Sequence, residues 1–188
     1  MTTAPRPSRI VGRVWSARDG SAAIEFVLVL PVLILLLFGT IDIGRLLADY
    51  RIAAQGIRDG ARYLARADPA DLGLDCGLGV VDGGSAPALA AMRLAMTGTP
   101  DGSAPYVLPY WTNSSSLATA GIGIAVTCVD NSGGTYRGLY DESLAVPSLT
   151  MSATVMVPLL NGWLLGYGAD LPVTVRHREP HVGGRWGA

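Results

Sequence analysis

An acidic residue near the start of a long apolar stretch is the strongest candidate for chemistry in this sequence. Glu25 lies in residues 20–45, GSAAIEFVLVLPVLILLLFGTIDIGR, where the next charged side chain is Asp42. An ionisable group inside a membrane segment costs roughly 2.5–3.5 kcal/mol on insertion scales and is a functional candidate by default. The chemistry open to such a carboxylate is pairing with a cation. The ordinary alternative is that Glu25 lies among lipid headgroups and pairs with Arg18.

Two cysteines are the second candidate, because a pair of thiols can close a disulfide. Cys76 and Cys128 both follow the apolar stretch and are expected on the outer side of a membrane. An exported chain meets an oxidising compartment, which favours the disulfide over the alternative of two buried thiols. The disulfide would close a loop of about 50 residues and contribute on the order of 4 kcal/mol.

The remaining polar residues form no recognisable catalytic or metal-binding pattern. Two histidines and two paired cysteines do not support a zinc site or a Cys–His nucleophile. Asp130 and Asp141 are spaced like the ends of a calcium loop, but Ser132, Gly134 and Thr135 stand where that loop needs ligands or glycine. We therefore predict no catalytic residue, no metal and no cofactor, and we do not expect an enzyme.

The element that must position Glu25 is an apolar helix long enough to cross a bilayer. Residues 22–41 amount to about 20 residues, which span roughly 30 Å at about 1.5 Å per residue. Pro31 and Gly39 interrupt this helix in a way that membrane helices tolerate. The composition, 49% hydrophobic and 15% charged, suits a membrane-attached chain and argues against a nucleic-acid partner. A secretory signal peptide does not fit, because no small-residue cleavage site follows the apolar core.

The distribution of arginines predicts the orientation of this helix. Four arginines precede it, at positions 6, 9, 13 and 18, with Asp19 as the opposing acid. Positive charge marks the cytoplasmic side of a membrane, so the N-terminus is predicted inside and the C-terminal domain outside. The expected organisation is a cytoplasmic leader at 1–20, a transmembrane helix at 21–43, an amphipathic extension at 44–67 and an extracytoplasmic head at 68–188.

The helix is predicted to continue beyond the membrane as an amphipathic segment. Apolar residues recur at spacings of three and four along one face, at Ile43, Leu46, Leu47, Tyr50, Ala54, Ile57, Ala61 and Leu64. Arginines and Gln55 occupy another side, from Arg51 to Arg66. Such a face must be covered, most simply by a packed head. Asp68-Pro69 is expected to end the helix, because a residue before proline avoids helical geometry.

The rest of the chain predicts a small α+β head packed on this helix. Residues 85–96 read as a short helix with Ser85 as N-cap and Gly98 after its end. Residues 121–129, 149–157 and 171–177 read as strands of an antiparallel sheet. The apolar residues 158–168 are expected to be buried in the head, the alternative being contact with lipid or a partner, and the tail from Pro180 is expected to be frayed. The predicted architecture is α+β and pilin-like.

The start of the apolar stretch resembles a known processing site. Gly20, four residues, Glu25 and the aromatic Phe26 resemble the pattern at which type IV prepilins and pseudopilins are cleaved. Over residues 20–62 the chain resembles more narrowly the TadE-like family of tight-adherence (Flp, type IVb) pili. Pro31, the exit from the span through Gly39, Asp42 and Gly44-Arg45, and the later Ala53-Ala54 and Arg62 carry this resemblance. Phe26 stands where many members have tyrosine.

The resemblance implies roles for these residues. A membrane prepilin peptidase would cleave after Gly20 and leave Ser21 as the new N-terminus, with Glu25 as the fifth mature residue. The new α-amine could then pair with Glu25 in the same or a neighbouring subunit, which would offset the cost of both charges in hydrocarbon. Glu25, Phe26 and Pro31 would thus act in recognition and assembly. The implied partners are inner-membrane lipid, the prepilin peptidase, other pilins or pseudopilins, and the pilus assembly platform.

Two functions from different classes remain open at this point. The first is a pseudopilin or minor-pilin-type assembly protein of an Flp pilus, acting by helix packing in the bacterial inner membrane. The second is a permanent single-pass anchor whose exported head binds surface or cell-wall components. Cleavage at Gly20–Ser21 separates the two, because large TadE-like relatives can keep their leader.

Overall fold

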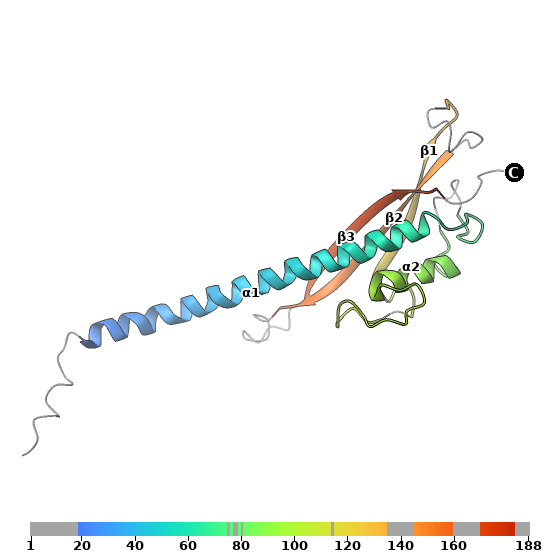
Figure 1. The fold of residues 1–188 in the computed structure, drawn as a ribbon. Helices are drawn as coiled ribbons and strands as arrows, with labels where there is room; N and C mark the ends of the chain where they lie inside the picture. Colours follow the sequence, from blue (N-terminus) through green and yellow to red (C-terminus); the bar gives the residue numbers. More distant parts are fainter. Residues whose placement is uncertain are drawn as a thin grey trace, which may run out of the picture. The chain divides into compact units, whose positions relative to one another are not determined.

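The computed structural model has the predicted α+β architecture (Figure 1). It describes residues 19–74, 76, 79, 81–113, 115–134, 145–159 and 170–182. The elements are α1 (Asp19–Leu64), α2 (Ala86–Thr97), β1 (Ile122–Asp130), β2 (Ala145–Pro158) and β3 (Asp170–Pro180). Three expectations fall largely outside the described residues: the leader before Asp19, most of the apolar stretch 158–168, and most of the calcium-like spacing between Asp130 and Asp141.

The chain divides into two units, Met1–Ile43 and Gly44–Ala188, and α1 contributes residues to both. In the first unit, most apolar side chains of α1 are exposed. Leu28 is 71% exposed and Val27 64%. Apolar surface exposed along a helical segment of this length favours a non-aqueous environment, so this part of α1 is suited to lipid. One helix in the described residues, near the N-terminus, is long and apolar enough to cross a membrane.

In the second unit, α1 buries a narrower face than the sequence predicted. Ala53, Ile57, Ala61 and Leu64 are at most 2% exposed and recur every three or four residues. Leu47 and Tyr50, by contrast, are 54% and 45% exposed. The prediction of burial at these positions is wrong, as is that for Ile43 in the first unit, because the fully buried apolar residues of α1 begin only at Ala53.

The end of α1 also differs from the prediction. The helix ends at Leu64 and not at Asp68. Arg66 and Ala67 donate backbone hydrogen bonds to Tyr63 and Leu64 at 3.2 and 3.1 Å. These bonds span three residues instead of four, so the chain tightens into a turn before it reaches the restricted residue ahead of Pro69.

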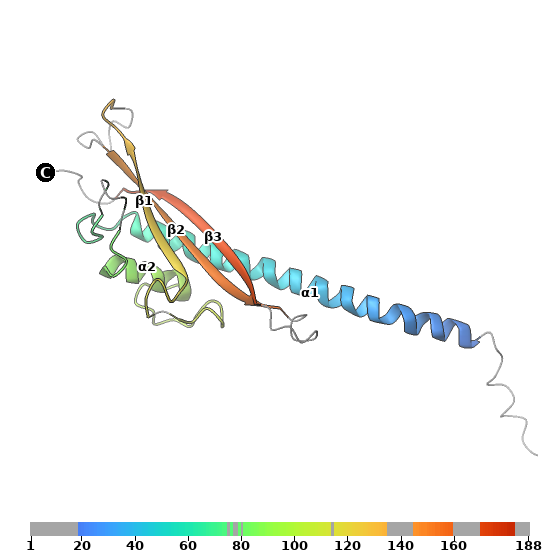
Figure 2. The same ribbon diagram turned by 180° about the vertical axis from the view of Figure 1, so that it is seen from behind.

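The three strands form one antiparallel sheet in the order β1-β2-β3 (Figure 2). Val126 pairs with Leu149, and Met151 pairs with His177. The central strand alternates as a half-buried strand should, with Leu149, Met151, Ala153, Val155 and Val157 all at most 4% exposed. All three predicted strands are confirmed, and β2 begins four residues earlier than expected.

Helix α2 closes the core through close contact with α1. The predicted caps are confirmed: Ala88 donates its N–H to Ser85 Oγ at 3.3 Å, and Gly98 ends the helix with a positive φ of 80°. Gly56 and Gly60 of α1 face Ala95 and Ala91 of α2. A Cβ on Gly56 would collide with the Ala95 carbonyl, so the two helices touch here through their backbones.

The chain beyond β3 is held in place at its start, which corrects the prediction of a frayed tail from Pro180. His181 is fully buried, and its backbone N–H donates to Pro147 O at 2.9 Å. Val182 donates to Ala65 O at 2.7 Å. The residues after Val182 lie outside the described residues. A buried imidazole fixes this short segment, and a polar residue in a Gly-rich tail gave no sequence signal for that burial.

Candidate functional site

The candidate processing and assembly residues all lie in the first unit, within α1. Gly20 lies in its first turn, and Glu25 and Phe26 follow on the exposed surface of the helix. Phe26 is 59% exposed. A Cβ on Gly20 would meet nothing within 4 Å. Neither the glycine nor the carboxylate is therefore required for packing against the described residues of this chain.

The helical geometry brings position 21 next to the carboxylate. Ser21 and Glu25 are four residues apart in α1, and positions i and i+4 are neighbours on one helix face. An α-amine at position 21 would thus have the Glu25 carboxylate one turn away, or the carboxylate of an adjacent helix.

Pro31 lies inside α1, which continues as one helix through it. Proline has no backbone N–H, so the carbonyl of Val27, four residues earlier, has no helical hydrogen-bond donor. Gly39 follows eight residues later, and a Cβ there would meet nothing within 4 Å. A free carbonyl and a flat glycine surface on an apolar helix are features that a second helix can use.

The predicted disulfide is present and is structural. Cys76 and Cys128 are bonded, with their Cα atoms 5.6 Å apart, and no described cysteine is free. The bond joins the loop after α1 to the end of β1 across a separation of 52 residues. Cys128 packs against the hydrophobic core, so the bond ties that loop to the sheet.

The described residues contain no cluster of three or more histidine, cysteine or acidic side chains that could hold a metal ion. Both histidines have structural partners. His177 Nε2 lies 2.8 Å from Glu179 Oε1, and His181 Nε2 lies 2.9 Å from Ala67 O. The hydrogen bond from His177 lowers the pKa of the Glu179 carboxyl, and Arg62 adds to the effect.

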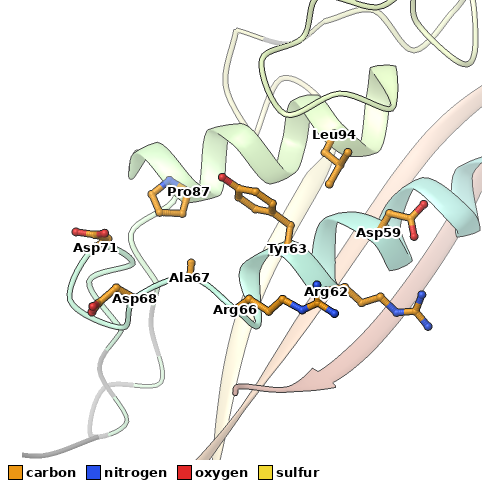
Figure 3. A pocket seen from close by; sticks show the side chains of 9 residues that line it. All are labelled: Asp59, Arg62, Tyr63, Arg66, Ala67, Asp68, Asp71, Pro87 and Leu94. Carbon is orange, nitrogen blue, oxygen red and sulfur yellow. The ribbon is translucent and has the colours of Figure 1, made fainter. Parts of the chain in front are cut away.

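A cavity of about 650 Å³ opens in the head between the end of α1, the loop after it and α2 (Figure 3). Its lining is Asp59, Arg62, Tyr63, Arg66, Ala67, Asp68, Asp71, Pro87 and Leu94. Tyr63 points toward Pro87 of α2, while Arg62 extends from α1 and Arg66 from the turn that follows it. Sequence reasoning did not find this cavity, because it depends on how the loop folds back beside α2.

Comparison with known proteins links the chain to one family. Residues 20–62 match the family model described as TadE-like protein. No curated protein and no solved structure matches the chain. The matched residues run from the first turn of α1 to within two residues of its end and include Glu25, Phe26 and Pro31.

The TadE-like family is a pilus assembly family and not an enzyme family. The match and the long apolar helix together support a membrane protein associated with tight-adherence pili. The helix itself suggests a single-pass anchor. The resemblance predicted from the sequence is confirmed over residues 20–62, which match the TadE-like family model.

Proposed function

We propose that this protein is a pseudopilin or minor-pilin-type assembly protein of an Flp (type IVb, tight-adherence) pilus. The observation that carries the proposal is that the TadE-like match covers the apolar, uncovered part of α1 on which Glu25 is exposed. A costly carboxylate that no described part of the chain needs for packing is best explained by a partner outside the chain. The partners we infer are other pilins or pseudopilins and the assembly platform.

We infer that the protein lies in the bacterial inner membrane with its N-terminus in the cytoplasm and its head outside. The arginines before Asp19 favour a cytoplasmic N-terminus. The Cys76–Cys128 disulfide is consistent with a head in an oxidising compartment. Residues 1–20 would be the leader, 21–43 the span, 44–67 the helical extension and 68–188 the head.

In this proposal, Glu25 acts after the prepilin peptidase has cut between Gly20 and Ser21. The α-amine released at Ser21 pairs with a Glu25 carboxylate, in the same helix or a neighbouring one. In hydrocarbon, each charge offsets the desolvation cost of the other, so the pair can fix the axial register between two helices. Phe26 and Pro31 then lie on the surface that meets the adjacent helix.

Substitution of Glu25 tests this function directly. Glu25→Gln keeps the size of the side chain and removes its charge, so we expect piliation in the native host to be lost. Membrane insertion, measured by fractionation and alkaline extraction, should be unchanged, because removing a charge makes the span more apolar. Leu28→Ala truncates an exposed side chain one turn further on and serves as the control. Wild-type piliation in Glu25→Gln cells would contradict the proposal and favour a permanent membrane anchor.

A further inference from the structure

A second groove in the head lies between α1 and β3, and it is basic. Its volume is about 500 Å³, and its lining is Tyr50, Arg51, Ala54, Gln55, Arg58, Asp59, Arg62, Arg176 and His177. All of these residues belong to the second unit. Four arginines therefore line the groove together with one acidic residue, Asp59, and they come from two elements more than a hundred residues apart in sequence.

Most of these arginines have no partner of their own. Among the described residues, Arg51, Arg58 and Arg176 form no ion pair, and all three are exposed. Arg62 contacts Glu179, with Nε and Oε1 3.4 Å apart. Unneutralised like charges held around one groove repel each other, so binding of an anion there relieves repulsion as well as forming new contacts.

At the rim of the groove, two of its lining residues already bind a carboxylate, that of Glu179. Glu179 on β3 places Oε1 2.8 Å from His177 Nε2 and 3.4 Å from Arg62 Nε. The same two residues line the groove. The chain contains arginines but no lysine. A guanidinium offers its donors in a fixed fork that matches a carboxylate, which makes protein carboxylates suitable ligands here.

The shape and the neighbouring sheet edge favour an extended chain as the occupant. β3 pairs with β2 along one edge, and no described strand pairs with its other edge. Arg58 and Arg62 are one turn apart on α1, a rise of about 6 Å, which is close to the distance between alternate residues of a strand. A groove bounded by a helix and a strand is also a poor match for a flat lipid surface.

We propose that this groove binds an acidic, extended segment of a partner protein, with its carboxylates paired to Arg51, Arg58, Arg62 and Arg176. Backbone groups of the segment can add hydrogen bonds to the free edge of β3, between Pro172 and Pro180, which have no N–H to donate. The inference goes beyond the proposed role in pilus assembly and does not depend on cleavage or on Glu25.

The test uses the full-length protein in neutral detergent and a fluorescein-labelled octapeptide in which glutamate alternates with threonine. Fluorescence anisotropy measures binding, and the same peptide with glutamine in place of glutamate is the control ligand. We expect the glutamate peptide to bind with a strong salt dependence and the glutamine peptide not to bind. Arg58→Gln/Arg176→Gln should weaken binding by about ten-fold or more.

The matched control is Arg66→Gln/Arg93→Gln, which removes the same charge from exposed arginines that do not line the groove. It should bind within about two-fold of wild type. Equal losses in the two double variants would overturn the proposal, as would wild-type protein that fails to distinguish the glutamate from the glutamine peptide. If phosphatidylglycerol in mixed micelles distinguishes the double variants and the peptide does not, the groove is a lipid site and the proposal is wrong.

Discussion

At the scale of single residues, the polar side chains that matter in this molecule are of two kinds. Glu25 is exposed on an apolar helix, where its cost has no compensation within the described chain. His181 is the opposite case, fully buried and hydrogen-bonded through both its side chain and its backbone. The first points outward to a partner, and the second contributes to the stability of the head.

Burial of His181 predicts a pH dependence of stability. Desolvation lowers the pKa of its imidazole below the ordinary value of about 6.5, against smaller opposing effects of Ala67 O and Asp68. The unfolded chain therefore binds a proton more readily than the folded chain. The stability due to the neutral imidazole is full above about pH 6.5 and decreases as the pH falls from there toward the lowered folded value.

The measurement is chemical denaturation of the full-length protein in detergent between pH 8 and 5. His181→Gln should be less stable than wild type near neutral pH and should lack most of the decrease below about pH 6.5. His177→Gln keeps His181 and should retain that decrease. The pKa of Glu179 is lowered in the folded chain. Its protonation therefore causes a separate loss of stability, which begins only when the pH falls below the ordinary pKa of a glutamate. If the free energy of unfolding of His181→Gln decreased as steeply below about pH 6.5 as that of wild type, His181 would not be the group responsible.

At the scale of elements, structure that depends on residues close in sequence could be predicted, whereas contacts between distant segments could not. The alternation over residues 149–157 and the Ser85 and Gly98 caps reflect local chemistry, and both predictions were confirmed. The extent of the covered face on α1 was mispredicted at Leu47 and Tyr50, because it depends on where the head ends. The groove beside Arg58 was missed for the same reason, since Arg176 reaches it from a strand far along the chain.

The contact between α1 and α2 is an element-scale feature that a single methyl group can disrupt. A Cβ at Gly56 would collide with the backbone of Ala95, which cannot move like a flexible side chain. Gly56→Ala should destabilise the head by about 1–3 kcal/mol through overpacking, although alanine is the better helix former. Gly44→Ala is the matched control, because a Cβ there meets nothing within 4 Å.

Thermal unfolding of full-length protein, followed by the near-ultraviolet signal of the head, should show a lower midpoint for Gly56→Ala. For Gly44→Ala the midpoint should be equal or slightly higher, since replacing a helical glycine by alanine gains about 0.5–1 kcal/mol. A Gly56→Ala variant as stable as Gly44→Ala would mean that the two helices are further apart than described.

At the scale of the whole molecule, the TadE-like segment and the head differ in how much of their function the sequence indicates. The segment 20–62 carries the family likeness, whereas the sheet, α2 and the disulfide lie outside the match. The sequence could therefore predict a membrane helix with a processing signal, but it could not identify what the head binds. Binding by the head rests on side chains that only the fold brings together, such as Arg58 and Arg176.

Processing between Gly20 and Ser21 is the prediction that concerns the whole chain, because it decides which N-terminus the molecule keeps. The chain has no lysine, so an amine-reactive label attaches only to its α-amine. Mass spectrometry of labelled protein from the native host should find the label on Ser21, in a tryptic peptide that ends at Arg45. Gly20→Val should prevent this, because a branched side chain hinders close approach of the peptidase to the scissile bond.

The same substitution should leave the fold unchanged, since a Cβ at Gly20 meets no other described atom within 4 Å. Loss of the Ser21 label in a folded, membrane-inserted Gly20→Val protein would therefore report on the peptidase and not on misfolding. A wild-type protein labelled only at Met1, in cells with active peptidase, would show an uncleaved anchor. Glu25 would then have no α-amine one turn away, and its partner would be Arg18 at the headgroup level or a cation on another chain.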